Sequence, residues 1–164
     1  FKHYSMTYYD QISGGYKELH QEEQQKKIQI INQVLDIKET DLMLDVGCGP
    51  HFGNFNCTVL GIDPSIELLK QAVIPVALAK AEKLPFNDNT FDIVISVTAI
   101  QNFDDIKQGL FEMRRVCKGI MVFTFLKKAK NSKSIRELID LYFHVEQIIE
   151  EDKDFIYITK YKNE

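Results

Sequence analysis

Two glycines and two aspartates stand at the ends of neighbouring apolar runs, a pattern suited to holding a nucleoside. The first run ends in Asp45, Gly47 and Gly49, and the second ends in Asp63, 63 - 45 = 18 positions after Asp45. Glycines spaced by one residue permit a tight turn and let a ligand approach the backbone. A carboxylate at the tip of the next strand is suited to accept both hydroxyls of a ribose. The alternative is structural: the glycines serve only the turn, and Asp63 or Ser65 caps a helix.

The same turn lacks the third glycine that a dinucleotide would require. The G-x-G-x-x-G fingerprint would place it at position 52, which is Phe52, and the shorter G-x-G-x-G form would place it at His51. A pyrophosphate therefore lacks its usual cradle, whereas an adenosine that bears no phosphate does not need one.

Composition excludes several other kinds of chemistry. The three cysteines show no C-x-x-C spacing and the four histidines are scattered, so no zinc or other metal site is expected and the thiols are expected to be reduced, in the cytoplasm. The formal net charge of -4 argues against a protein that coats nucleic acid through bulk charge. The longest apolar runs are too short to cross a bilayer, so no membrane role is expected.

The residues at the strand ends need a scaffold that brings several strand ends to one edge. With 164 residues, of which 45% are apolar, the chain has the size of one domain. After Thr40, short apolar runs alternate with helical intervals, which is typical of a parallel sheet covered by helices on both faces. The predicted strands are 42–46, 58–62, 76–79, 91–97, 120–125, 145–149 and 155–159. The predicted helices are 17–37, 66–72, 106–116 and 134–141.

The last two predicted strands are joined by the short acidic turn 150–154, which only an antiparallel pair can accommodate. The sequence therefore predicts an α/β fold: a Rossmann-like, doubly wound, mostly parallel sheet of seven strands that ends in an antiparallel hairpin.

The order of the motifs along the chain resembles a known family. The segments are 44–49 (LDVGCG), 61–65 (GIDPS), 81–92 (AEKLPFNDNTFD), 94–102 (VISVTAIQN) and 112–116 (EMRRV). In this order and at these intervals they resemble the class I S-adenosylmethionine-dependent methyltransferases, in particular the small type 11 branch. The resemblance runs from about Tyr9 to Phe125.

The resemblance implies a cofactor contact for residues that follow the first four strands. They are Asp45, Gly47, Cys48 (through its backbone) and Gly49 for the methionine part, Asp63 for the ribose, and Pro64, Ile66, Ala81 and Glu82 for the adenine end. The stretch from Ser96 to Thr98 would form the floor beside the sulfonium. Near the start, Tyr9-Asp10 and Tyr16 resemble the family's aromatic-acidic segment, so Tyr16 would close over the methionine carboxylate; simple packing is the alternative for Tyr16.

The acceptor side is less defined. Thr98, Gln101 and Asn102 follow the fourth strand and are placed to orient an acceptor, although polar residues also suit an ordinary loop. His51 is a candidate for the same role or for a general base, with a helix-start residue as the alternative. The N-P-P-[YF] signature of amide and exocyclic-amine methylation is absent, which disfavours that branch.

The sequence also departs from the family pattern. Lys80 stands where the family usually has an aspartate that accepts from the adenine amino group, and a lysine cannot accept. Only residues 51–56 separate the glycine turn from the second strand, and the usual Pro-Gly-Gly turn before the fifth strand has shrunk to Lys118-Gly119.

These observations predict a methyltransferase that uses S-adenosyl-L-methionine, releases S-adenosyl-L-homocysteine and acts on an unidentified acceptor. Residues 40–164 would form the cofactor-binding core, and the aromatic segment and helix in residues 1–39 would cover the site. Acceptor recognition would come from that segment, from a second copy in a homodimer, or from a small activator subunit that pairs along an edge strand.

Two alternatives stay open. One is a cofactor-binding domain without transfer activity, suggested by Lys80 and His51. The other is an RNA-modifying enzyme that uses a basic run after the fifth strand, for which a solvated loop is the simpler explanation. The residues of that run are Lys127, Lys128, Lys130, Lys133 and Arg136.

Overall fold

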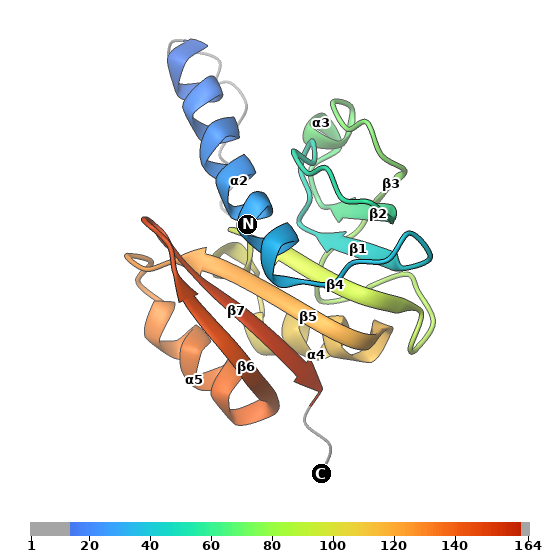
Figure 1. Cartoon of the computed structure of the whole chain (residues 1–164), viewed down its shortest axis with the longest axis vertical. Helices are drawn as coiled ribbons and strands as arrows, with labels where there is room; N and C mark the ends of the chain where they lie inside the picture. The colour runs from blue at the N-terminus through green and yellow to red at the C-terminus, as the bar shows by residue number, and fades with distance from the viewer. Residues whose placement is uncertain (1–13, 162–164) are drawn as a thin grey trace.

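A seven-stranded sheet with its helices on both faces organises the chain (Figure 1). A computed structural model describes residues 14–161. The strands are β1 (Leu42–Val46), β2 (Thr58–Asp63), β3 (Val76–Leu78), β4 (Phe91–Val97), β5 (Cys117–Leu126), β6 (Phe143–Glu150) and β7 (Asp154–Tyr161). The helices are α2 (Gly14–Val34), α3 (Ile66–Leu69), the 3-10 turn η1 (Ile100–Asn102), α4 (Ile106–Val116) and α5 (Ser132–Tyr142).

The strand order is β3-β2-β1-β4-β5-β7-β6. The strands from β3 to β5 run parallel, whereas β7 pairs antiparallel with both β5 and β6. The predicted doubly wound sheet with a closing antiparallel hairpin is therefore confirmed. Because chain order reverses between β1 and β4, the carboxyl ends of these two strands meet at a switch point, the place where such sheets bind ligands.

Each face of the sheet is covered by its own apolar layer. Helix α2 packs Ile28, Ile31 and Leu35 against one face of the sheet, where Met43, Ile95 and Val122 belong to the same cluster. Helices α4 and α5 cover the other face with residues such as Leu110, Met113, Ile135 and Ile139. The two layers position helix α2 beside the switch point.

Several predicted boundaries were wrong by a few residues. Helix α2 ends at Val34 rather than at residue 37, because the chain then turns, with the Lys38 amide donating to the Asp41 carboxylate (2.9 Å). Helix α3 ends at Leu69 rather than at residue 72, since Gln71 and Ala72 donate to Leu68 and Leu69 in turn-like bonds. Strand β5 begins three residues early at Cys117, which pairs with Phe91 across an irregularity in the register.

Candidate functional site

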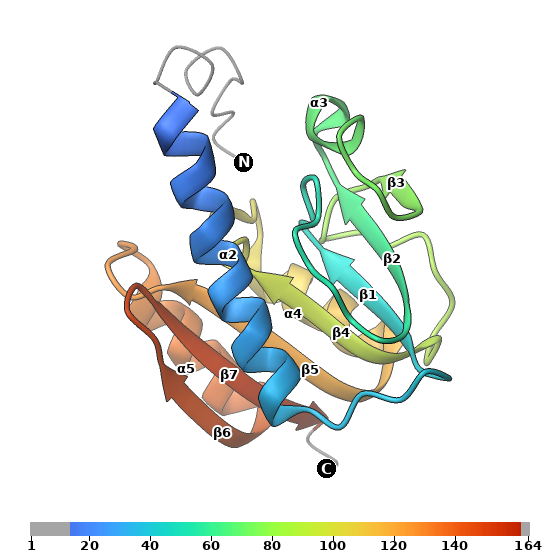
Figure 2. The same cartoon turned by 45° about the horizontal axis from the view of Figure 1, so that its top comes forward.

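The carboxyl ends of β1, β2 and β4 point toward the region between α2 and α3 (Figure 2). Here β1 runs into the glycine turn, which we define as residues 47–49. The amides of Gly47 and Cys48 both donate to the carbonyl of Ile62 at the end of β2, at 2.8 and 2.9 Å. The turn is thus anchored to the neighbouring strand, and its backbone is presented at the switch point.

Glycine is required at the two positions of this turn for different structural reasons. Both have positive φ, +75° at Gly47 and +50° at Gly49, which L side chains rarely adopt. A Cβ on Gly47 would lie 2.7 Å from the Cβ of Ala99, so packing forbids it. A Cβ on Gly49 would find its nearest neighbour, Leu68 Cδ1, only at 3.8 Å. At Gly49 a Cβ would therefore make only an ordinary van der Waals contact, so the positive φ rather than packing accounts for this glycine.

Asp45 and His51 form a buried pair next to the turn. His51 Nδ1 lies 2.6 Å from Asp45 Oδ2, and the two residues are 6% and 4% exposed. The other carboxylate oxygen, Asp45 Oδ1, is buried and has no hydrogen-bond partner within the described residues. An unsatisfied buried acceptor is costly unless a donor completes it, so this oxygen is suited to a ligand ammonium. His51 is occupied by Asp45 rather than open to an acceptor.

Asp63 braces the turn that follows β2. Its Oδ2 accepts from the Gly49 amide (3.0 Å) and its Oδ1 from the Ser65 amide (2.8 Å), and the residue is 3% exposed. Burial raises the pKa of this carboxyl, and the two amide bonds oppose the shift. Each carboxylate oxygen accepts one amide, so lone pairs remain for the two hydroxyls of a ribose.

The positions expected at the adenine end lie on the turns after β2 and β3. Ile66, the first residue of α3, is half exposed and Pro64 is partly buried, so both offer apolar surface. Glu82 accepts from the Asp105 amide (3.1 Å) at the start of α4, next to the buried Ala81.

Lys80 stands where the family usually has an aspartate, and it forms an ion pair with Asp104 at 3.1 Å. The loop after β4 therefore brings a carboxylate to the place where the sequence departs from the family.

Ser96 and Thr98 sit at the end of β4 in different environments. Ser96 is completely buried, and its hydroxyl donates to the carbonyl of Val46 (2.9 Å), which ties β4 to β1. Thr98 has φ +52°, an uncommon conformation for a β-branched residue and a mark of local strain. The Gln101 amide group donates to the Thr98 carbonyl (3.0 Å), and the backbone amide of Asn102 donates to the Ala99 carbonyl (2.9 Å). Thr98, Gln101 and Asn102 thus share one turn, whereas the fourth predicted acceptor-side residue, His51, is bonded to Asp45.

Sequence reasoning missed a buried ionic cluster beside Thr98. Lys27 of α2, 1% exposed, lies 3.1 Å from the carboxylate of Asp154, which is completely buried at the start of β7. The ammonium of Lys27 also donates to the Thr98 hydroxyl (2.9 Å), which in turn donates to Asp154 (2.7 Å). Thr124 of β5 donates to the same carboxylate at 3.1 Å. A signal was present, because Lys27 stands four residues before Ile31 on the apolar face of the helix.

Two of the remaining predicted features lie outside the described residues, and the described cysteines are unreactive thiols. Tyr9-Asp10 lies outside the described residues, and Tyr16 belongs to the first turn of α2 but its side chain lies outside them as well. Burial raises the pKa of the Cys48 thiol, and it raises the pKa of Cys117 to about 11, so these cysteines stay protonated. No cluster of metal-ligating side chains occurs among residues that the structure describes, and no described helix is long and apolar enough to cross a membrane.

The basic run after β5 is partly engaged within the protein. Lys127 pairs with Glu150 at 3.4 Å, and the Arg136 guanidinium bonds to the Tyr157 hydroxyl (2.9 Å) and stacks over Phe155. Lys128, Lys130 and Lys133 are exposed. Because Lys127 and Arg136 are engaged within the protein, the five basic residues of the run are not all free to contact RNA. This weakens the RNA-modifying alternative.

Comparison with known proteins gives this site a family. Residues 44–123 match the family model described as a methyltransferase domain, of type 11. An uncharacterized protein of Methanocaldococcus jannaschii is 36% identical over 128 residues, covering 71% of this chain and 49% of the relative. The malonyl-[acyl-carrier protein] O-methyltransferase of Hamiltonella defensa is 36% identical over 124 residues, covering 68% of this chain and 46% of the relative.

The fold recurs in solved structures. One is the complex of the Haloferax volcanii Trm112 methyltransferase activator with its methyltransferase, which superimposes with a TM-score of 0.76 at 15% identity and covers 92% of this chain and 95% of that one. Residues 44–123 therefore belong to the methyltransferase domain family of type 11, and the sheet that contains them has the fold of that solved structure. The chain spans about half the length of the curated relatives it matches or less.

Proposed function

We propose that this protein transfers a methyl group from S-adenosyl-L-methionine to an acceptor. The observation that carries the proposal is the cradle at the switch point: the glycine turn with its positive φ angles, the unsatisfied Asp45 Oδ1, and Asp63, whose Oδ2 accepts from the Gly49 amide. Asp45 Oδ1 is suited to an ammonium, Asp63 to the hydroxyls of a ribose, and a turn without a third glycine to a nucleoside that bears no pyrophosphate. The residues present therefore fit the cofactor that the family uses.

Different residues of the site would bind different parts of the cofactor. Asp45 and the backbone of residues 47–49 would hold the methionine part, with Asp45 Oδ1 accepting from its ammonium. Asp63 would accept from the ribose hydroxyls, and Pro64 and Ile66 would cover the adenine. Ala81 and Glu82 would line the adenine edge, where Asp104, paired with Lys80, would accept from the amino group in place of the missing aspartate.

Methyl transfer requires mainly that the acceptor be aligned with the methyl group. When bound, S-adenosylmethionine supplies an activated methyl group, so the protein's contribution is to orient the acceptor and exclude water. Thr98, Gln101 and Asn102 would orient the acceptor at the end of β4. The buried bonds of Thr98 to Lys27 and Asp154 hold this segment in place before the acceptor arrives.

The experiment has two measurements. Calorimetry with S-adenosylmethionine and S-adenosylhomocysteine tests binding, and tritiated methyl transfer into fractionated cell extract tests turnover and shows whether the label lands in small molecules, protein or RNA. Absence of binding of either compound would contradict the proposal. Binding without transfer into any fraction would instead support the alternative, a cofactor-binding domain without activity.

A protein partner is the second part of the proposal. Strand β3 is one edge of the sheet, and it and its flanks expose apolar side chains: Leu78 is 59% exposed, Val73 88% and Ile66 50%. An unpaired apolar edge is suited to strand addition by another chain. We infer a small activator subunit or a second copy there, in line with the Trm112 complex of similar fold.

Light scattering distinguishes the two kinds of partner, a second copy and an activator subunit. A second copy predicts a dimer that Leu78→Glu converts to a monomer, whereas an activator predicts a monomer that becomes more soluble on co-expression with a Trm112-type protein. A soluble monomer whose recovery neither Leu78→Glu nor co-expression changes would contradict both.

A further inference from the structure

Two ion pairs fix one face of α2 against the turn between β6 and β7. Lys27 reaches the buried carboxylate of Asp154 at 3.1 Å, and one turn earlier Glu23 pairs with Lys153. The first pair is almost entirely buried, so it holds its geometry more firmly than a surface pair would. The face of α2 that carries Glu23 and Lys27 is therefore held at the strand ends.

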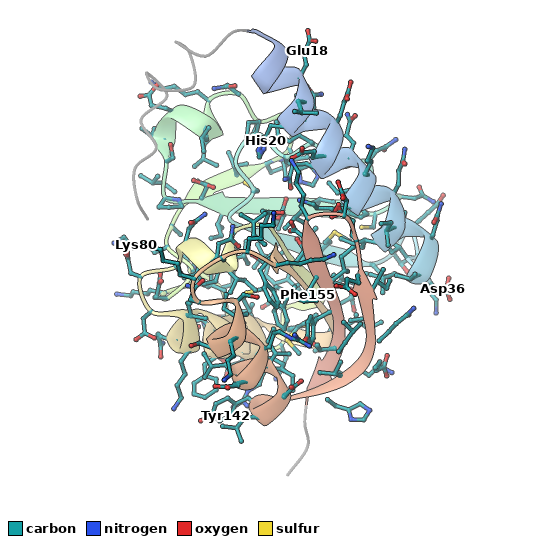
Figure 3. The ribbon with its side chains drawn as sticks, turned by 90° about the vertical axis from the view of Figure 1, so that its left-hand side faces the viewer. Glu18, His20, Asp36, Lys80, Tyr142 and Phe155 are labelled. Carbon is teal, nitrogen blue, oxygen red and sulfur yellow. The ribbon has the colours of Figure 1, made fainter. Side chains whose placement is uncertain are left out.

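His20 lies on this same face, three residues before Glu23 and seven before Lys27. Its ring meets the ring of Phe52 edge to face, with centroids 6.4 Å apart. Phe52 belongs to the loop that directly follows the glycine turn. Figure 3 shows His20 on the side of α2 that faces α3. The contact with Phe52 thus places the imidazole beside the loop that follows the glycine turn.

The ring nitrogens of His20 are available. Within the described part of the chain, His20 makes no hydrogen bond and no ion pair, and the residue is exposed. His51, by contrast, is committed to Asp45, and His144 lies on the outer edge strand β6. Among the described histidines, His20 is the one that combines a free ring with a position at the site.

The surroundings of His20 favour its neutral form. Neighbouring protein atoms that partly desolvate the exposed imidazole lower its pKa, and the ammonium groups of Lys27 and Lys153 lower it further, while Glu23 acts in the opposite direction. A neutral imidazole can accept a proton, and Glu23 lies close enough to stabilise the imidazolium that results.

We propose that His20 is the general base of the methyl transfer, acting on an acceptor that arrives as an O–H or N–H group. The acceptor oxygen or nitrogen forms its bond to the methyl carbon as the carbon–sulfur bond breaks. The electron pair of that bond stays on sulfur, and the acceptor's proton passes to a ring nitrogen of His20. The inference rests on the proposed function and assigns its missing base and its acceptor class.

The test compares His20→Gln and His20→Ala with the wild type and with His144→Gln, which removes a histidine from the far edge. Transfer of tritiated methyl groups into the active extract fraction is measured with S-adenosylhomocysteine binding, and the His20 pKa is followed by NMR. We expect His20→Gln to lower the rate roughly 100-fold, to change the dissociation constant less than twofold, and imidazole to restore activity to His20→Ala. The NMR titration is expected to place the His20 pKa below its ordinary value.

The outcomes separate this inference from the proposed function. If the wild type neither binds S-adenosylhomocysteine nor transfers methyl groups, both are overturned. If it transfers and His20→Gln keeps most of the activity, only the base is overturned. A loss of activity that imidazole does not restore, or an NMR pKa above the ordinary value, would also overturn the base and leave the methyltransferase standing.

Discussion

At the scale of single residues, the site depends on atoms that are left without an internal partner. Asp45 Oδ1 is buried without a hydrogen-bond donor in the described part of the protein. The Ser96 hydroxyl, by contrast, already donates to the Val46 carbonyl. The proposed contact of Asp45 with the cofactor therefore rests on an unused acceptor rather than on residue type alone.

The two glycines of the turn should respond differently to alanine. Gly49→Ala must adopt φ +50° but makes only an ordinary van der Waals contact, 3.8 Å from Leu68 Cδ1, so it should cost about 1–2 kcal/mol of stability. It should also weaken S-adenosylhomocysteine binding about tenfold or more by placing a methyl group in the cradle. Gly47→Ala adds a contact of 2.7 Å to Ala99 and should be clearly less stable. Urea unfolding and calorimetry measure both. Unchanged binding in Gly49→Ala would contradict the placement of the cofactor.

His20 gives the stability a defined dependence on pH. The folded protein lowers the pKa of His20 below its ordinary value of 6.5. As the pH falls below that value, the unfolded chain therefore binds more protons than the folded protein, and protonation favours unfolding. The wild type should therefore lose stability relative to His20→Gln as the pH falls from about 7.5 to about 5. Chemical denaturation of both proteins across this range measures it; a constant difference would show that His20 is not perturbed.

At the scale of elements, helix α2 is the piece that packs beside the switch point where the cofactor is proposed to bind. Its apolar face packs on the sheet through Ile28, Ile31 and Leu35. Its ionic contacts, through Lys27 and Glu23, are made to the turn between β6 and β7 instead. The antiparallel hairpin thus has a role beyond closing the sheet, because it supplies the carboxylate that anchors α2 beside Thr98.

Removing one partner of the buried pair should be costly. Lys27→Met leaves the carboxylate of Asp154 buried and uncompensated and should cost about 3–5 kcal/mol. Adding Asp154→Asn removes the charge and should restore more than about 1 kcal/mol. Lys26→Met, at an exposed neighbouring position, should change stability by less than about 0.5 kcal/mol. Urea unfolding of the three variants tests this; a double variant less stable than Lys27→Met would contradict it.

At the scale of the whole molecule, the proposed cofactor site is combined with an apolar edge at β3. The chain covers only part of its curated relatives, and the residues expected to orient an acceptor are few. Acceptor identity is therefore a property that a partner chain at the β3 edge can supply.

Ligand binding should be visible in the thermal stability of the domain. S-adenosylhomocysteine at 100 times its dissociation constant should add about 2.7 kcal/mol, which raises Tm by roughly 5–10 °C in a protein of this size. NAD should cause no shift, because His51 and Phe52 stand where a pyrophosphate cradle needs glycine. Differential scanning calorimetry measures both shifts. A larger shift with NAD than with S-adenosylhomocysteine would contradict the choice of cofactor.

The sequence by itself determined the parallel sheet, its closing hairpin and the positions at the strand ends. These follow from local patterns: apolar runs of strand length, a turn too short for a crossover, and glycines spaced by one residue. Strand and helix ends were less certain, as β5 and α2 show, because pairing across the sheet and turn bonds decide them.

Only the tertiary structure decided how these positions are used. That Lys27 is buried against Asp154 and that His20 contacts Phe52 depends on contacts between segments far apart in the chain. Such contacts are fixed by how α2 packs across the sheet, since a helix face and a strand end become neighbours only after folding. The helical spacing of Lys27 and Ile31 indicates which face is buried, but it does not name the partner residues.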